Sequence, residues 1–186
     1  MVSAFRRTVI AERRRPGPCV AVSVFPNNPG HLRTFDYVGL YRYFLTFCTD
    51  YRQPFFADET AVELVLSQIL RAACEERFAL VAYCFMPDHA HLLIEAEQES
   101  SNGRAFIKRA KQFSGFYYSQ QFGRRLWQRY GFEHVLRNDE ATLSVARYIL
   151  ENPVRAGLVS CVEDYQFLGS TAYAVADILA AESMSG

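Results

Sequence analysis

The sequence lacks the features that mark membrane, secreted and disulfide-rich proteins. It contains no run of about 18 consecutive apolar residues, so we expect no segment that spans a membrane. The arginine-containing start holds no apolar stretch long enough for a signal peptide. Five cysteines are present, an odd number, and their wide spacing excludes a disulfide framework and a zinc knuckle. These absences favour a protein of a reducing cytoplasm whose cysteines are small buried side chains.

Net charge is absent as well, because 20 acidic side chains balance 20 basic ones. Half of the 186 residues are hydrophobic and 15% are aromatic, which excludes a chain that is disordered throughout. The length excludes a large multidomain enzyme and favours one domain with an extension. Residues 1–36 are rich in arginine and proline, and we expect them to be a poorly ordered extension. The domain is then expected over residues 37–170, followed by a C-terminal tail over 171–186.

The neutral total hides one strongly basic stretch. Residues 104–137 hold eight basic side chains, six of them arginine, against Glu133 as the one acid. Aromatic side chains are interleaved with these cations, a combination that suits a phosphate backbone with unstacked bases. The alternative is a solvated helix face above a stripe of core residues. The candidates for phosphate contact are Lys111, Arg124, Arg125 and Arg129.

The hydrophobic pattern predicts an α+β fold. Strands or extended segments are expected at 37–49, 80–86, 89–96 and 127–137, and helices at 59–77, 104–122 and 140–150. Asp58 and either Ser101 or Asn102 are suitable N-caps, and Gly123 is a suitable C-terminal stop. The order strand, helix, strand, strand, helix, strand favours a ferredoxin-like split βαβ arrangement. In that arrangement an antiparallel sheet carries its helices on one face.

A pair of histidines at the start of one predicted strand is the strongest chemical signal. His89 and His91 stand two residues apart, so the two imidazoles lie on the same face of the strand. Two neutral imidazoles on one face form a natural half-site for a divalent cation. The third ligand would be a carboxylate or amide on the packed helix, or Glu95. The alternative is that these are hydrogen-bonded strand histidines without a metal.

The helix predicted at 104–122 supplies tyrosines that could act as nucleophiles. The row that ends at Tyr117 has helical spacing and should pack on the sheet, with Gln121 one turn further on. Tyr118 belongs to the neighbouring row. A tyrosine that reaches the sheet near the two histidines would be activated by a metal, and the amide of Gln121 could complete the metal shell. The alternative is that both tyrosines are aromatic residues at the edge of the core.

Several segments, taken in order, resemble the single-tyrosine HUH transposases, and specifically their REP-associated branch. They are Tyr43–Thr49, Tyr83–Leu93, Lys111–Gly115, Leu126–Arg129, Val135–Glu140, Tyr148–Ile149 and Asn152–Val159. The resemblance implies a ferredoxin-like domain that acts on single-stranded DNA, often beside a hairpin. It implies that His89 and His91 bind Mg²⁺ or Mn²⁺, and that a helix tyrosine attacks phosphorus to give a 5′-phosphotyrosine and a free 3′-OH. It also implies a homodimer in the bacterial cytoplasm, associated with the nucleoid.

The sequence departs from the family at one position. Relatives commonly carry tyrosine directly after the Ser114-Gly115 pair, whereas this chain has Phe116. Three interpretations remain: Tyr117 is the nucleophile, Tyr118 is the nucleophile, or the nucleophile is lost. The first two predict a transposase that cleaves and rejoins DNA. The third predicts a catalytically inactive DNA-binding protein, and an unrelated metal phosphodiesterase is a further alternative.

Overall fold

The computed structural model describes residues 36–129, 131–136 and 139–181. The extension expected at residues 1–36 therefore lies outside the described residues except for Asp36, as do the last five residues of the tail expected at 171–186. Within the described part of the chain, no helix is both long and apolar enough to cross a membrane.

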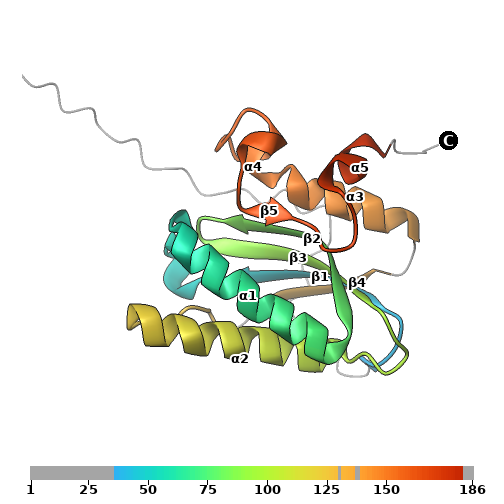
Figure 1. Ribbon diagram of the computed structural model, residues 1–186, viewed down its shortest axis with the longest axis horizontal. Helices are drawn as coiled ribbons and strands as arrows, with labels where there is room; N and C mark the ends of the chain where they lie inside the picture. The colour runs from blue at the N-terminus through green and yellow to red at the C-terminus, as the bar shows by residue number, and fades with distance from the viewer. Residues whose placement is uncertain (1–35, 130, 137–138, 182–186) are drawn as a thin grey trace, which may run out of the picture.

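The described residues form a five-stranded antiparallel sheet with the strand order β4-β1-β3-β2-β5 (Figure 1). The strands are β1 (Arg42–Cys48), β2 (Phe78–Met86), β3 (His89–Ala96), β4 (Phe132–Leu136) and β5 (Leu168–Gly169). β1 pairs with β3 along its whole length, so that Cys48 lies opposite His89. The order β1, α1, β2, β3, α2, β4 along the chain confirms the predicted α+β, ferredoxin-like arrangement.

Two long helices cover one face of the sheet. They are α1 (Glu59–Glu76) and α2 (Gly103–Phe122). The side chain of Asp58 accepts from the backbone of Thr60, and that of Asn102 accepts from Ala105, so both helices begin at predicted caps. Gly123 ends α2 with a φ of 67°, a left-handed conformation that glycine adopts without strain. Between this pair and the sheet lies the larger apolar core.

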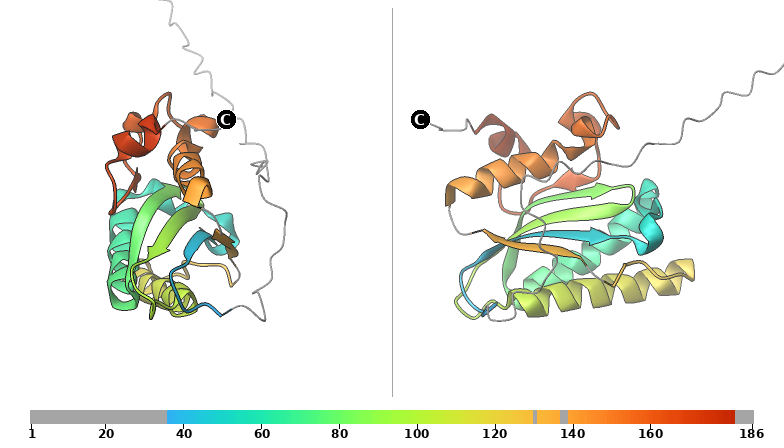
Figure 2. Two further views of the ribbon diagram at one scale, coloured as in Figure 1. Left: turned by 90° about the vertical axis from the view of Figure 1, so that its right-hand side faces the viewer. Right: turned by 180° about the vertical axis from the view of Figure 1, so that it is seen from behind.

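A second helical layer covers the other face, which corrects the expectation of helices on one face (Figure 2). Its helices are α3 (Asp139–Leu150), α4 (Asn152–Arg155) and α5 (Val175–Ala180). The physical reason is that the central strands are apolar on both faces. Phe44, Val81 and Leu93 point away from α1 and α2 and are buried against α3. The expected tail contributes to this layer, because Ile178 of α5 is buried in the same core.

Two short 3₁₀ helices connect β1 to α1. They are η1 (Asp50–Arg52) and η2 (Phe55–Ala57). The backbone N–H groups of Thr49 and Phe56 donate to the carbonyls of Asp88 and Pro87, so this connection is fastened to the β2–β3 turn. A third, η3 (Val162–Asp164), lies between α4 and β5. The β1–α1 connection and the β2–β3 turn therefore meet at one end of the sheet, directly beside His89.

Candidate active site

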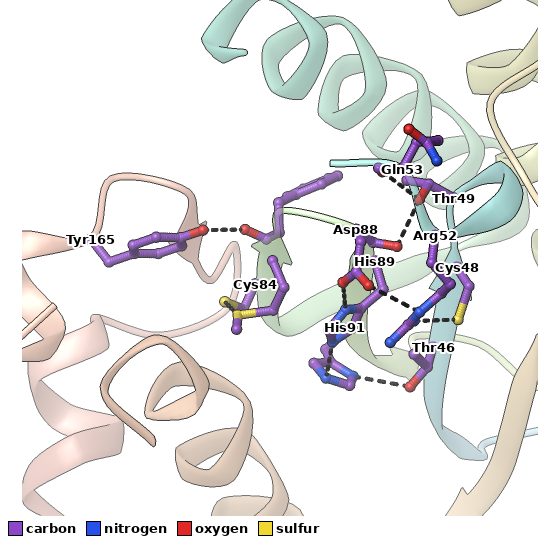
Figure 3. A network of polar contacts seen from close by, with 12 residues as sticks. Thr46, Cys48, Thr49, Arg52, Gln53, Cys84, Asp88, His89, His91 and Tyr165 are labelled. Atoms are coloured by element: carbon purple, nitrogen blue, oxygen red, sulfur yellow. Dashed lines mark hydrogen bonds and ion pairs between the residues drawn. The ribbon is translucent and has the colours of Figure 1, made fainter. Parts of the chain in front are cut away.

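The two histidines share one face of β3, as the spacing predicts, and they lie close to each other. His89 and His91 are both 8% exposed, and their Nε2 atoms are 3.0 Å apart (Figure 3). Because strand residues alternate between faces, Ala90 and Leu92 face α1 and α2, whereas the histidines face the α3 layer. The ring of His91 stacks on Phe44, a core residue of that second layer.

Each imidazole is oriented through its outer nitrogen. His89 Nδ1 lies 2.6 Å from an oxygen of Asp88, and His91 Nδ1 lies 2.9 Å from the hydroxyl of Thr46. Burial lowers the pKa of His91 well below its ordinary value, and the neighbouring His89 and Arg52 lower it further. Burial opposes ionisation of Asp88, yet its hydrogen bond with His89 and the charges of His89 and Arg52 hold its pKa below the usual range. The result is a neutral His91 beside an ionised Asp88.

This geometry fits a divalent cation. Two ligands at right angles with bonds of about 2.1 Å are separated by about 3.0 Å in an octahedral shell. The two Nε2 atoms have this separation and share a hydrogen bond in this structure, which a bound cation would replace. Partners on the outer nitrogens are the usual way in which metal-binding histidines are held. Among the described residues no group of three or more histidine, cysteine, aspartate or glutamate side chains is arranged to hold a metal ion.

Glu95, the carboxylate considered as a third ligand, is not near the pair. It stands at the other end of β3, where its carboxylate lies 2.8 Å from Nε of Arg42. The structure therefore uses Glu95 in an ion pair between β3 and β1, and this corrects the expectation.

The tyrosine that meets the histidines is Tyr148, on α3. Its ring centre lies 6.5 Å from that of His91 and 6.4 Å from that of Phe44. The amide nitrogen of Asn152, one turn further on, donates to the carbonyl of Tyr148 over 2.7 Å. The guanidinium of Arg155 lies 4.9 Å from the centre of the Tyr148 ring and is paired with Glu151. Tyr148, Glu151, Asn152 and Arg155 thus form one polar stripe along α3 and α4.

The tyrosines expected from the sequence do not reach the histidines. Tyr118 is fully buried in the core on the opposite face of the sheet, where it stacks on Phe55 and packs against Phe122 at a tilt. Tyr117 is 40% exposed on α2, and Gln121 is also exposed. The expectation that one of these tyrosines and Gln121 share a site with the histidines is therefore wrong, because α2 covers the other face. Phe116 is 58% exposed on the same helix, so its departure from the family does not touch the histidine site.

The basic residues divide into one that supports the fold and three at the surface. The ammonium group of Lys111 is partly buried, donates to the carbonyls of Gln128 and Arg129, and has a pKa lowered by burial. Lys111 therefore anchors the loop after α2, and its role in phosphate contact stays a prediction. Arg124, Arg125 and Arg129 are exposed. Their role in phosphate contact stays a prediction.

The loop that carries these arginines lies at the histidine end of the sheet. Gln128 N–H donates to the carbonyl of Cys48, and Asp50 N–H donates to that of Leu126. Arg125 lies 3.8 Å from Asp50, and Arg124 lies 4.3 Å above the ring of Phe55. Since Cys48 is paired with His89, the basic loop and the histidine pair share one end of the molecule.

Tyr148 is not among the candidates selected from the sequence for this site, although a signal was present. Polar side chains recur at positions 148, 151, 152 and 155, a spacing of three, four and seven residues that places them on one helical face. The same segment carries a buried apolar row through Val145 and Ile149. A polar stripe beside an apolar row on a sheet-packed helix indicates a site at the edge of the core.

Comparison with known proteins agrees with the fold and the sequence motifs. The family model described as "Transposase IS200 like" matches residues 37–152. A Haemophilus influenzae protein assigned as a REP-associated tyrosine transposase is 31% identical over 112 residues, which cover 52% of this chain and 62% of that protein. The chain thus matches less than two thirds of that relative's length.

Two solved structures are also similar. A REP-associated tyrosine transposase bound to a REP hairpin superposes with a TM-score of 0.63 at 21% identity, over 75% of this chain and 81% of that one. A Deinococcus radiodurans protein assigned as a transposase has a TM-score of 0.45 at 28% identity, over 63% of this chain and 94% of that one. The first shares the fold described above. Since the family model spans more than half of the sequence, from before β1 to the first residue of α4, the chain belongs to the IS200-like transposase family.

Proposed function

We propose that this protein cleaves and rejoins single-stranded or hairpin DNA through a covalent bond to Tyr148. The observation that carries the proposal is the placement of the Tyr148 ring against His91, on the sheet face that holds both histidines. The proposal replaces Tyr117 and Tyr118, which lie on α2 across the sheet. It also removes the basis for an inactive protein, because that alternative rested on Phe116.

The chemistry follows from this placement. The phenol oxygen of Tyr148 attacks a backbone phosphorus, a tyrosine O–P bond forms, and the bond from phosphorus to the 3′ oxygen breaks. The phenol loses its proton to solvent and the departing 3′ oxygen takes one up, which leaves a 5′-phosphotyrosine and a free 3′-OH. Attack of a 3′-OH on this bond reverses the step and joins two strands. No nucleotide cofactor is needed, because the covalent bond conserves the energy of the phosphodiester.

The histidine pair would hold the cation that such a reaction uses. His89 and His91 would supply two nitrogens, and Asn152 would supply its side-chain oxygen, since its nitrogen is occupied by backbone carbonyls. A bound Mg²⁺ or Mn²⁺ would polarise the phosphate as a Lewis acid. Asp88 and Thr46 keep both imidazoles directed at one point before DNA arrives.

The basic loop after α2 would hold the DNA strand. Arg124, Arg125 and Arg129 lie at the end of the sheet that carries His89, so a strand bound there passes the proposed site. A hairpin is the natural first ligand to test, because the solved relative is bound to a REP hairpin. A homodimer, which the family resemblance implies, stays a prediction that light scattering would test.

Trapping of the covalent adduct tests the proposal. Hairpins labelled at the 5′ or the 3′ end are incubated with the protein and Mg²⁺ or Mn²⁺ and then denatured. We expect the 3′ label to remain on the protein and the 5′ label to be released, because tyrosine holds the 5′ phosphate of the downstream fragment. Tyr148→Phe removes one oxygen and should abolish the adduct, whereas the matched control Tyr117→Phe should retain it. An adduct in Tyr148→Phe would place the nucleophile elsewhere.

A further inference from the structure

The loop next to the histidines adopts a conformation that side chains ordinarily avoid. Tyr51 and Arg52, two consecutive non-glycine residues, have φ values of 50° and 56°. The left-handed region is unfavourable for an ordinary residue, so it persists only where other contacts hold it. These are the last two residues of η1, which follows β1 after Thr49. The strained backbone thus lies at the same sheet end as the β2–β3 turn that precedes His89.

Several contacts of this loop involve Asp88. The backbone N–H of Thr49 donates to the carbonyl of Asp88 over 3.0 Å, and the Thr49 hydroxyl lies 2.8 Å from the same carbonyl oxygen and 2.7 Å from that of Gln53. The backbone N–H of Arg52 donates to the carbonyl of Thr49. The Arg52 side chain then returns to the same turn, with Nε 3.0 Å from Oδ2 of Asp88 and Nη1 2.9 Å from the sulfur of Cys48 (Figure 3).

Asp88 consequently has both carboxylate oxygens occupied. Oδ2 faces Arg52, and Oδ1 lies 2.6 Å from Nδ1 of His89. The two histidines are held differently. His91 is held directly by Thr46 of the adjacent strand β1, whereas His89 is held by a carboxylate in a turn. A carboxylate in a turn can rotate unless its second oxygen is fixed, and Arg52 fixes it.

We infer that Arg52 is a positioning residue for His89, acting through Asp88, and that the strained η1 loop exists to present it. The inference rests on the proposed function, because it treats His89 and His91 as metal ligands. In this interpretation Arg52 holds Asp88, and Asp88 in turn holds His89. Arg52 is then not a DNA-contacting residue. Loss of the Arg52 side chain should free the carboxylate, loosen the imidazole and weaken metal binding without removing a ligand.

Metal affinity is the direct test. Mn²⁺ binding is measured by titration calorimetry, without DNA, on the full chain and on three Arg52 variants. We expect Arg52→Ala to weaken Mn²⁺ binding by about 10-fold, the lower end for loss of a partner that orients a ligand. Arg52→Lys should recover part of the loss, since an ammonium can reach the carboxylate. Arg52→Gly relieves the positive φ and should therefore fold at least as well, yet it should bind Mn²⁺ as weakly as Arg52→Ala.

Arg71→Ala is the matched control. Arg71 makes an ion pair of the same 3.0 Å length, with Glu75, and its side chain is 51% exposed against 41% for Arg52. It lies on α1, in the other helical layer. This variant should bind Mn²⁺ like the unaltered chain. With saturating Mn²⁺, Arg52→Ala should regain most of its kcat for cleavage while its KM for the metal stays raised.

Three outcomes would contradict either the role of Arg52 or the proposed metal site. Equal Mn²⁺ affinity in Arg52→Gly and the unaltered chain would overturn the role of Arg52. A loss of hairpin affinity for Arg52→Ala in EDTA, with Mn²⁺ affinity unchanged, would overturn it in favour of a phosphate contact. Absence of Mn²⁺ binding in the unaltered chain, with the His91→Ala variant behaving identically, would instead overturn the proposed metal site on which the inference rests.

Discussion

Helices α2 and α3 pack on opposite faces of one sheet, and each carries a tyrosine into the interface. On α2, Tyr118 is fully buried among aromatic rings. On α3, Tyr148 is half-buried, with its ring beside an imidazole and under a guanidinium. The difference lies in β3, which presents Ala90 and Leu92 to α2 but His89 and His91 to α3. One strand thus makes one face a structural core and the other the face of the proposed chemical site.

Replacement of a histidine should have the largest effect on activity, because it removes a proposed metal ligand from the sheet face that α3 covers. His91→Ala or His89→Ala deletes one of the two nitrogens of the proposed metal half-site. We expect cleavage and adduct formation to fall below detection, while hairpin affinity in EDTA stays unchanged. Adduct trapping and a filter-binding titration measure the two properties.

Gln121→Ala is the contrasting variant on α2. Gln121 is exposed on the helix that covers the other face. It should therefore retain Mn²⁺ affinity and cleavage. If Gln121→Ala lost Mn²⁺ binding and His91→Ala kept it, the assignment of chemistry to the α3 face would be wrong.

The fold and the placement of both histidines on one strand face follow from the sequence, and the reasons are specific. The two imidazoles could be placed on one face because the period of a strand is two residues, and the helix ends could be placed because Asp58, Asn102 and Gly123 have clear capping roles. The second helical layer could not be placed. β1, β2 and β3 are apolar on both faces, so their pattern does not say which face a given helix covers.

The prediction that the Tyr117 row of α2 packs on the sheet is wrong, because the row that is buried contains a serine. Ser114 is fully buried, donates to the carbonyl of Ala110 and accepts from the indole N–H of Trp127. A hydroxyl with both partners satisfied packs as core, although its side chain reads as polar. The row through Phe113 and Tyr117 therefore appeared more apolar than the row through Ser114 and Tyr118. The contact between Ser114 and Trp127, which the sequence does not reveal, shows which of the two rows is buried.

Truncation of Tyr118 should have the next largest effect, on stability rather than on chemistry. Tyr118→Ala removes a fully buried ring that packs against Phe55 and Phe122, and we expect a loss of about 3–5 kcal/mol in unfolding free energy. Tyr118→Phe keeps the ring and should change stability by about 1 kcal/mol or less. Urea denaturation measures both.

The same substitution at Tyr148 should have the opposite effect on activity. Tyr148→Phe should keep nearly full stability and lose the adduct, whereas Tyr118→Phe should keep both. A stable, adduct-deficient Tyr118→Phe would contradict the division between a structural and a chemical face.

Charge reversal in the loop after α2 should have the smallest effect, because it lowers the affinity for hairpin DNA without abolishing binding. Arg124→Glu with Arg125→Glu places two negative charges beside the histidine end of the sheet. We expect hairpin affinity at about 0.1 M salt to fall at least tenfold, roughly 1.4 kcal/mol. If both residues contact phosphates of a single strand, the slope of log affinity against log salt should become shallower by about 1.4.

A change of net charge alone would also weaken DNA binding, so the control must carry the same charge. Arg104→Glu with Lys108→Glu reverses two exposed charges in the same basic stretch, at the beginning of α2 rather than after its end. Because the helix separates the two pairs by most of its 20 residues, a strand on the loop lies well beyond a Debye length of about 10 Å from this control pair. The control should therefore shift affinity much less and keep the salt slope. Equal losses in the two double variants would mean that the basic stretch acts only through its total charge, and the loop would lose its special position beside the histidine site.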